Sequence, residues 1–405
     1  SYVDGQGFPE HVTSHTDRTV LGGVVGRTPG ETILGSIEKE HITATDTDDD
    51  IDAGGGDDRV DAGKGADVID AGEGNDAIYL EADSVWGAGF EAARVEWLPN
   101  GTTQIAETLV LEGKNRFLDV VDGNADFDTI VLTDDFRGDA FFLHDFFSDF
   151  NASQSTAFVM DAEGNSGTTR MAGVERILAR QGDDVIDLTS LDFVVNNLEI
   201  QGNGGNDILW GNDGDDIIDG GIGTDILAGG RGADRFVIRL QEGVQSDAEA
   251  DHIRDFDIGV DKISLAGGLT FSDLLITEIT TGPDAGKVSI AHKDRGEIYV
   301  VLDNLKAADV VSLTASSFEI YTLDEGIQIA GIAEEDQTLF LDLSAIYSKA
   351  EDAALRVIWQ SSLDGMDWDI LSQSTEASLP LKQQHVNYMI RAKVSFEDAY
   401  GFVRT

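Results

Sequence analysis

Aspartates that follow glycines at a fixed spacing are the residues of this chain with the clearest chemical potential. Residues 202–237 form four consecutive frames of nine residues, each with glycine at the fourth position and aspartate at the sixth. Glycine is disfavoured inside helices and strands, but it permits a tight turn with positive φ whose carbonyls point into one space. Carbonyl and carboxylate oxygens, without histidine or cysteine, are the ligands of a hard cation such as Ca²⁺. The pattern therefore predicts calcium sites built from glycine-rich turns.

The eighth position of each frame indicates how these turns are arranged. It is always apolar, and the three residues around it suit a short strand that sends only its middle side chain inward. A fixed short period with one apolar residue per repeat predicts a solenoid, with two frames in each coil. Turns two frames apart then stack on the same edge, with Asp207 above Asp225 and Asp216 above Asp234. Stacked carboxylates repel one another unless a cation lies between them.

A first block with the same period covers residues 53–79. Its three frames carry Asp58, Asp67 and Asp76 at the sixth position and alanine at the first. Because alanine tolerates positive φ poorly, we expect the first position not to need it. The preceding segment 44–52 keeps the sixth-position aspartate but lacks glycine, so we interpret it as a degenerate first turn.

The two blocks resemble the calcium-binding nonapeptide repeats of RTX (repeats-in-toxin) proteins, whose pattern is G-G-x-G-x-D-x-U-x. The resemblance implies a parallel β-roll. A weaker frame at 179–187 re-enters the period, and residues 174–177 are similar to the strand that often leads into such repeats. Residues 251–263 are similar to the segment that closes many RTX rolls, and Asp255, Asp257 and Asp261 are candidates for one further ion.

Calcium is the cofactor that this resemblance implies, with about three to six ions if stacked turns bind one each. We predict ions between turns 44–49 and 62–67, 53–58 and 71–76, 202–207 and 220–225, and 211–216 and 229–234. The candidate ligands are turn glycines and acidic side chains: Asp49, Gly54, Gly56, Asp58, Gly63, Gly65, Asp67, Gly72, Gly74, Asp76, Asp184, Gly202, Gly205, Asp207, Gly211, Gly214, Asp216, Gly220, Gly221, Gly223, Asp225, Gly229, Gly230, Gly232, Asp234, Asp255 and Asp261.

The chain is strongly acidic. Its 405 residues include 77 acidic and 27 basic side chains, for a formal net charge of −50. So much like charge destabilises a compact state unless it is neutralised, and bound Ca²⁺ would couple folding to the metal. The charge argues against nucleic acid or an anionic membrane as a direct partner. Cysteine is absent, which excludes disulfides and a thiol nucleophile, and no segment has the apolar length of a membrane span.

The C-terminal residues 323–405 read as short alternating strands separated by turns. They resemble the Ig-like β-sandwich repeats of large bacterial surface proteins and adhesins, with Trp359 as the expected core tryptophan. Residues 1–14 repeat the pattern of residues 395–405. We therefore expect the chain to come from a longer tandem array, in which the first strand ends a preceding module. The alternative is that this strand pairs with the exposed edge of a neighbouring copy.

Aromatic residues gather in the insertions between residues 80 and 178, and we expect them to pack as a cap rather than to form an exposed patch. Three histidines of the N-terminal half do not indicate a catalytic or zinc site. His11 and His15 lie in an extended stretch, where a spacing of four does not hold a metal. His144 has no serine or second acid at a recognisable spacing, so we interpret it as structural.

The fold class predicted is all-β: two blocks of RTX parallel β-roll with inserted loops and a β cap, followed by an Ig-like β-sandwich. The predicted segments are a terminal strand of a preceding Ig-like module (1–14), a linker (15–43), a first block with an insertion (44–135), an aromatic-rich insertion or cap (136–178), a second block (179–237), cap strands (238–322) and the sandwich (323–405).

Three functions remain open. The favoured one is a non-enzymatic, calcium-stabilised structural or adhesive segment of a large secreted or cell-surface protein of a Gram-negative bacterium. By the RTX resemblance it would leave the cell by type I secretion and fold in calcium-containing medium, with calcium and neighbouring modules or copies as partners and any surface ligand unknown. The second is the non-catalytic part of a secreted protease, lipase, epimerase or peroxidase, since the chain lacks H-E-x-x-H and G-x-S-x-G. The third is a calcium-dependent filament or layer assembled by strand exchange.

Overall fold

The computed structural model describes residues 29–321 apart from 89–90, 98–102, 134–136, 144–169, 190–194, 196 and 241. Beyond Tyr321 it describes seven strands and Lys382. The chain divides into two compact units, Ser1–Tyr321 and Thr322–Thr405. The predicted strand 1–14, which contains His11 and His15, lies outside the described residues. His144 lies outside them as well.

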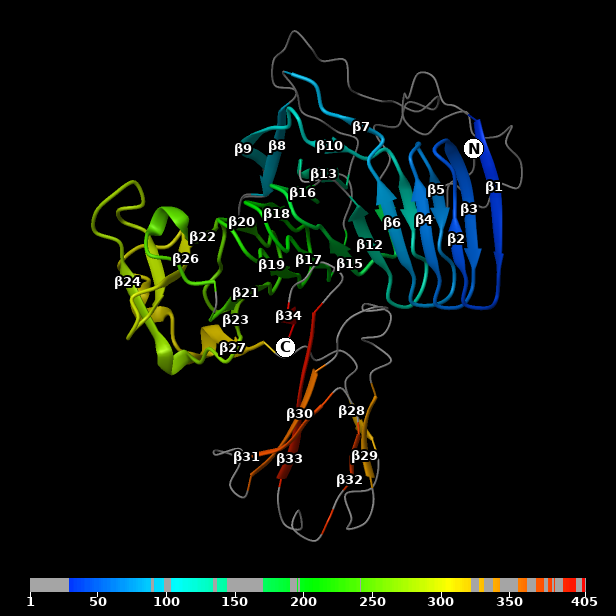
Figure 1. Ribbon diagram of the computed structural model, residues 1–405. Helices are drawn as coiled ribbons and strands as arrows, with labels where there is room; N and C mark the ends of the chain where they lie inside the picture. Colours follow the sequence, from blue (N-terminus) through cyan, green and yellow to red (C-terminus); the bar gives the residue numbers. More distant parts are fainter. Residues whose placement is uncertain are drawn as a thin grey trace. The chain divides into compact units, whose positions relative to one another are not determined.

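The first unit is a parallel β-roll with two strand-covered faces (Figure 1). One face is a continuous ten-stranded sheet, here called the front sheet. Its strands run in the order β2 (His41–Thr43), β4 (Arg59–Gly63), β6 (Ala77–Glu81), β12 (Thr129–Thr133), β15 (Arg176–Leu178), β17 (Glu199–Gln201), β19 (Ile217–Asp219), β21 (Arg235–Arg239), β23 (Lys262–Ala266) and β27 (Phe318–Ile320).

The opposite face consists of two sheets. The first back sheet contains β1 (Pro29–Ser36), β3 (Asp48–Gly54), β5 (Val68–Asp70), β11 (Val120–Asp122) and β14 (Met171–Ala172). The second back sheet runs through β7 (Ser84–Val85), β10 (Asn115–Arg116), β13 (Asp139–Phe142), β16 (Val185–Asp187), β18 (Ile208–Trp210), β20 (Ile226–Ala228), β22 (Asp251–Ile253), β26 (Ile298–Leu302), β25 (Val288–His292) and β24 (Leu274–Glu278). Where the two meet, the Arg170 N–H donates to the Leu143 carbonyl at 2.7 Å.

Strand pairing follows the nine-residue period. Partners within each block lie 18 residues apart, so that Ile51 faces Ile69 and Leu209 faces Leu227. These eighth-position side chains are buried in one continuous core that runs along the roll. Burying each contributes about 1.5–3 kcal/mol, and a one-residue slip would turn all of them outward. The predicted parallel β-roll is therefore confirmed.

The roll begins earlier than the sequence analysis placed it. Strands β1 and β2, assigned to a linker at 15–43, pair in parallel with β3 and β4. Ile33 faces Ile51, and Ile42 faces Val60. The linker assignment is thus wrong for residues 29–43, while residues 15–28 lie outside the described part. The period was hidden there because these turns lack the paired glycines.

The segment 136–178, predicted to be an insertion or cap, also supplies roll strands. Strand β13 joins the second back sheet, β14 the first back sheet and β15 the front sheet. Likewise, the segment 188–201, interpreted as an excursion between frames, contributes β17. Parallel pairing with neighbours 18 to 50 residues away, rather than a local glycine-rich motif, places these strands.

The insertion at 84–113 packs two side chains, Trp86 and Leu111, on the second back sheet. It contains β7 and an antiparallel hairpin of β8 (Glu91–Trp97) and β9 (Thr103–Val110). Trp86 and Leu111 are buried against a cluster that includes Phe142 and Trp210. The Trp86 and Phe142 rings meet edge to face with centroids 6.3 Å apart. These aromatic residues therefore pack as predicted, whereas Phe146, Phe147 and Phe150 of the same predicted cap lie outside the described residues.

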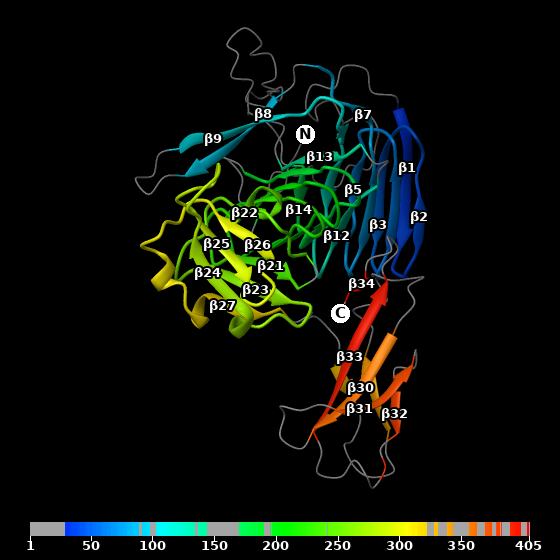
Figure 2. The same ribbon diagram turned by 60° about the vertical axis from the view of Figure 1, so that its left-hand side comes forward.

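The predicted cap closes the C-terminal end of the roll. Strands β24, β25 and β26 form an antiparallel meander, and β26 continues the back sheet by pairing in parallel with β22 (Figure 2). Four short 3₁₀ turns accompany them: η1 (Asp247–Glu249), η2 (Phe271–Asp273), η3 (Val310–Ser312) and η4 (Ala315–Ser317). No helix in the described part of the chain is long and apolar enough to cross a bilayer.

The second unit consists of antiparallel strands. One sheet contains β28 (Gln328–Ala330), β29 (Thr338–Asp342) and β32 (Ser378–Pro380), and the other β31 (Asp369–Ser374), β30 (Arg356–Ser362), β33 (Met389–Glu397) and β34 (Val403–Arg404). Trp359 and Val357 of β30 are fully buried, as expected for core residues of a β-sandwich.

Candidate metal centre

The glycine-rich turns stack backbone against backbone along the two edges of the roll. A Cβ on Gly223 would lie 1.6 Å from the carbonyl oxygen of Gly205, and one on Gly232 would lie 1.7 Å from that of Gly214. Each pair lies 18 residues apart, so the turns that were predicted to face one another do so. Fourth-position glycines also have positive φ, for example +155° at Gly223, which other residues adopt only with strain.

First-position residues need no positive φ, as the alanines of the first block indicated. Gly202, Gly211, Gly220 and Gly229 are absent from the positive-φ residues of the described chain, as are the alanines. These glycines provide space instead: a Cβ on Gly220 would lie 2.2 Å from Oδ2 of Asp225, and one on Gly229 would lie 2.0 Å from Oδ2 of Asp234. The first glycine therefore leaves room for the carboxylate of its own frame.

The sixth-position carboxylates form two columns, one along each edge. In each column, one oxygen of a carboxylate accepts the backbone N–H of the sixth-position residue one coil earlier. Asp225 accepts from Asp207 at 2.8 Å, and Asp234 from Asp216 at 2.9 Å. In the first block, Asp67 accepts from Asp49 and Asp76 from Asp58, both at 2.7 Å. All four predicted pairs of aspartates are therefore brought together.

Both columns extend beyond the repeats. The first column contains Asp49, Asp67 and Asp119 and, after an interruption, Asp139, Asp184, Asp207, Asp225 and Asp251. The second column contains Asp58, Asp76, Asp128 and Glu175 and, after Leu198 at a sixth position, Asp216, Asp234 and Asp261. The predicted residues Asp184 and Asp261 thus take their places in the columns.

Asp255, predicted as a ligand near the cap, lies outside both columns. Its two oxygens accept the backbone N–H groups of Gly229 and Gly230, each at 3.0 Å. Asp251 takes the column position instead, because it precedes the buried Ile253 by two residues, the spacing between sixth and eighth positions. The same spacing before an apolar strand residue, without any glycine, would also have identified Asp119 and Asp139.

A second ladder of side chains ties the turns together in the opposite direction. At the fifth position, a side-chain oxygen accepts the backbone N–H of the fifth-position residue one coil later. Asp57 accepts from Asn75 at 3.0 Å, and Asn206 accepts from Thr224 at 3.0 Å. These turns are therefore fixed to both neighbours, and the two ladders use only one oxygen of each sixth-position carboxylate.

That second oxygen is buried and makes no hydrogen bond within the described residues at a set of column positions: Asp58, Asp67, Asp76, Asp119, Asp128, Asp207 and Asp225. Burying an ionised oxygen without a partner is costly, and the cost falls when a cation coordinates it. Oxygen atoms alone, at buried turns on a glycine backbone, match the preference of Ca²⁺. The residues present therefore fit calcium.

Burial and mutual repulsion raise the pKa values of these carboxyl groups. Burial, with the neighbouring Asp49 carboxylate, raises the pKa of Asp67 to about 8. Burial, with Asp216 and Asp261, raises the pKa of Asp234 to about 8, and burial raises that of Asp216 to about 7. Without a divalent cation, the columns therefore hold protons near neutral pH.

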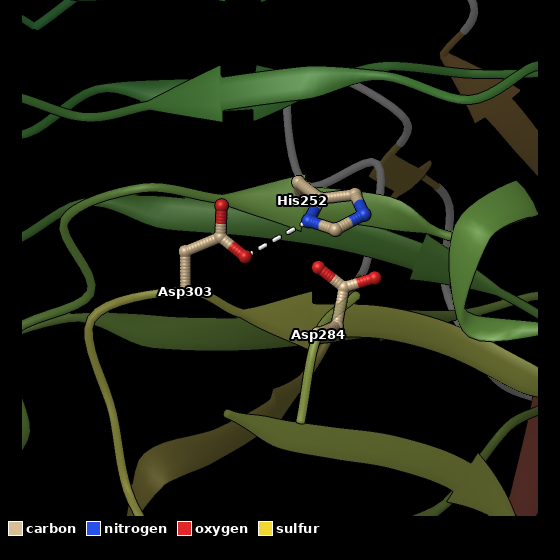
Figure 3. A group of neighbouring side chains, drawn as sticks. All are labelled: His252, Asp284 and Asp303. Atoms are coloured by element: carbon tan, nitrogen blue, oxygen red, sulfur yellow. Dashed lines mark hydrogen bonds and ion pairs between the residues drawn. The ribbon is translucent and has the colours of Figure 1, made fainter. Parts of the chain in front are cut away.

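A separate cluster lies in the cap, where His252, Asp284 and Asp303 bring their ligand atoms within 4.8 Å of one another (Figure 3). Lys287 Nζ lies 2.7 Å from a carboxylate oxygen of both aspartates, and Arg254 also pairs with Asp303. Burial raises the pKa of Asp303, but hydrogen bonds from His252, Lys287 and Arg254 outweigh it and hold that pKa well below its ordinary value. Cationic side chains already neutralise this cluster, so we interpret it as an ion-pair network that joins β22 to β26.

Comparison with known proteins identifies the repeats. A model of the RTX calcium-binding nonapeptide repeat (four copies) matches residues 43–78 and 201–236, which carry the stacked turns of both blocks. The two blocks are RTX calcium-binding nonapeptide repeats. Repeats of this family bind calcium, so calcium is the cation that these stacked turns bind.

Other comparisons are weaker. No curated protein matches the chain significantly. Among solved structures, the AlgE6R3 subunit of the Azotobacter vinelandii mannuronan C5-epimerase is 25% identical with a TM-score of 0.26, over 40% of this chain and 93% of the subunit. The extracellular lipase LipA from Serratia marcescens is 16% identical with a TM-score of 0.25, over 73% of this chain and 40% of the lipase. These TM-scores are too low to add to the assignment of the RTX roll.

The stacking predicts a large effect for one small substitution. Gly223→Ala places a Cβ against the carbonyl of Gly205 at positive φ, and we expect it to destabilise the RTX roll by at least ~2 kcal/mol. Gly87→Ala is the matched control, because Gly87 has no heavy atom within 4 Å of its Cβ position and no positive φ. Thermal melts in calcium should show a lower Tm only for Gly223→Ala. Equal melting of both variants would contradict the stacking of these turns.

Proposed function

We propose that this chain is a non-catalytic, calcium-stabilised structural segment of a larger secreted or cell-surface protein. In this function the roll is a rigid spacer whose folding depends on calcium outside the cell. Type I secretion and attachment to a bacterial surface belong to the same proposal. The proposal also includes an Ig-like second unit, which is supported by its two antiparallel sheets and the buried Trp359.

The proposal is supported mainly by the buried carboxylate oxygens of the two aspartate columns, which make no hydrogen bond among the described residues. An acidic chain with a net charge of −50 that buries two rows of carboxylates is poorly suited to fold where calcium is scarce. Extracellular calcium modules bind with dissociation constants of about 10⁻⁴–10⁻³ M, so this segment would stay open during export and close in calcium-rich medium.

The described histidines support a non-catalytic assignment. His41 pairs with Asp61, His252 with Asp303, and Nδ1 of His292 accepts the N–H of Asp294 in a tight turn. Each of these contacts joins strands or turns of the roll and its cap.

Calcium titration of the whole chain tests the proposal. Isothermal titration calorimetry should show several calcium ions per chain, whereas magnesium at the same concentration should bind weakly, because it demands a tighter octahedral shell. Light scattering should show a monomer throughout if the segment is a spacer. Growth into filaments with calcium would favour strand-exchange assembly, and absence of calcium binding would refute the proposal.

A further inference from the structure

The two aspartate columns break next to the same coil of the roll. The first column is interrupted between Asp119 and Asp139, and the second breaks after Glu175, because Leu198 takes the next sixth position. The back face changes from one sheet to the other at the same place, whereas the front sheet runs on from β12 through β15 to β17. The coil at this break contains β14 and β15 and is here called the middle coil.

The middle coil carries the only two arginines that are buried among the described residues. Arg170 is 8% exposed and Arg176 is 3% exposed, and no lysine in the described part of the chain is buried. Each arginine directly precedes a buried apolar strand residue, Met171 in β14 and Ile177 in β15. A roll that buries many carboxylates therefore buries arginine only where its columns break.

Arg170 contacts the last turn of the first column before the break. Its guanidinium donates to the carbonyl oxygens of Leu118 and Asp119. Burial raises the pKa of Asp83 to about 6 and that of Asp119 well above its usual range, while hydrogen bonds and the positive charge of Arg170 act against burial in both. Carbonyl and carboxylate oxygens are also the ligands of Ca²⁺, so the guanidinium meets the same kind of oxygen that the ion prefers.

Arg176 neutralises the acid that follows the missing column residue. Leu198 leaves the sixth position without a carboxylate, but the next residue, Glu199, is 9% exposed and pairs with Arg176, whose Nε lies 2.7 Å from Oε2. The Arg176 guanidinium also stacks on the Phe127 ring, 4.5 Å from its centroid. A guanidinium does not lose its proton in proteins, so these contacts need neither added protons nor a metal ion.

We propose that Arg170 and Arg176 are resident cations that stabilise the middle coil without calcium and divide the calcium sites of the roll into two groups. One group lies on the side of β3 to β12 and the other on the side of β16 to β23. Within each group the turns are stacked continuously, so that ordering one turn favours the next, and the middle coil interrupts this coupling. The inference rests on the proposed function, because it describes how a calcium-stabilised roll responds to the ion.

The arrangement sets the order in which the roll loses structure when calcium is removed. Without the ion, the column carboxylates on either side repel one another, whereas the arginine contacts of the middle coil remain. In chelator, the amides of β12 and β15 should therefore lose protection from hydrogen exchange later than those of β4 and β21. In Arg170→Met this order should disappear, because the middle coil then lacks one of its two cations.

The test is a set of Arg170 variants in the whole chain, measured by urea melts at pH 6.5 in calcium and in chelator. Arg170→Met should lower the urea midpoint in both, with no loss of bound calcium by calorimetry, because no ion lies at this contact. Arg170→Lys, which keeps the charge, should recover most of the loss, and Arg170→Gln, which keeps only a donor, should not. Arg295→Met is the matched control, since Arg295 is half exposed, pairs with Glu297 in the cap and should leave the midpoint unchanged.

A loss in Arg170→Met that calcium abolishes would overturn the proposal, and so would a lower ion count, because calcium would then supply the charge at this coil. Equal losses in Arg170→Lys and Arg170→Gln would also overturn it, since they mark packing or hydrogen bonding alone.

If Arg170→Met does not fold, Arg176→Met decides. Its loss should be the same with and without calcium, and adding Glu199→Gln should reduce it, because the buried carboxylate is then no longer left unpaired. A loss that Glu199→Gln does not reduce would contradict the role of a resident cation. A wild type that binds no calcium would refute the proposed function, while the melts in chelator would still decide the role of the arginines.

Discussion

In the presence of a chelator, the chain is expected to become more stable as the pH falls from 8 to 5. Six column carboxyl groups have folded-state pKa values raised by burial, to about 8 for Asp67, Asp128 and Asp234 and to about 7 for Asp76, Asp216 and Asp225. Their ordinary pKa is near 4. Between these values the folded chain binds more protons than the unfolded chain, so its stability decreases with rising pH.

The stability from these groups is fully present below pH 4 and is lost as the pH rises through 7 to 8. Even two such groups give a slope of about 2.7 kcal/mol per pH unit near pH 6. At pH 8 without calcium, we expect the parallel roll to unfold. Urea melts in chelator at pH 5, 6.5 and 8, followed by far-UV circular dichroism, measure the slope. Stability that increases with pH in chelator would contradict the buried columns.

Calcium should reverse this dependence, because the ion and the protons compete for the same oxygens. Affinity for calcium is then expected to increase between pH 6 and 8, with protons released on binding. Calorimetry in two buffers of different ionisation enthalpy measures that release. Calcium binding without proton release near pH 7 would show that the ions lie elsewhere.

We expect a second large effect when the charge of one column carboxylate is removed. Asp225 accepts the Asp207 N–H through Oδ1, while its Oδ2 is buried without a hydrogen bond in the described part of the chain. Asp225→Asn therefore keeps the shape and the hydrogen bond but loses the charge that a cation needs. We expect at least one calcium ion to be lost. In 10 mM calcium, a site with a dissociation constant of about 10⁻⁴–10⁻³ M contributes about 1.4–2.7 kcal/mol.

Asp294→Asn is the matched control, since it makes the same change in charge at an exposed turn of the cap. Calorimetric ion counts and urea melts in calcium should separate the two variants. In chelator, urea melts should show no loss of stability for Asp225→Asn. An unchanged ion count for Asp225→Asn would refute the assignment of the column oxygens as ligands.

Several acidic residues of the columns lie outside the periodic repeats and could not be predicted from the sequence. Asp119, Asp139 and Asp251 join the columns through hydrogen bonds to residues 26 to 52 positions away in sequence. Glu31 and Glu40 donate their N–H groups to Asp49 and Asp58 in the same way, from turns without the paired glycines of the repeats. The sequence shows these acids but not the coil to which they belong.

The repeats themselves were decided by the sequence alone. Glycine at the fourth position, aspartate at the sixth and an apolar residue at the eighth define a turn and a strand by local sterics, so two blocks of stacked turns could be derived from spacing. The tertiary structure decided the first coil at residues 29–43, the turn in which Asp83 accepts the N–H groups of Gly65 and Leu118, and the neutralised His252 cluster. These depend on long-range parallel pairing and on which charges burial brings together, and neither leaves a periodic mark in the chain.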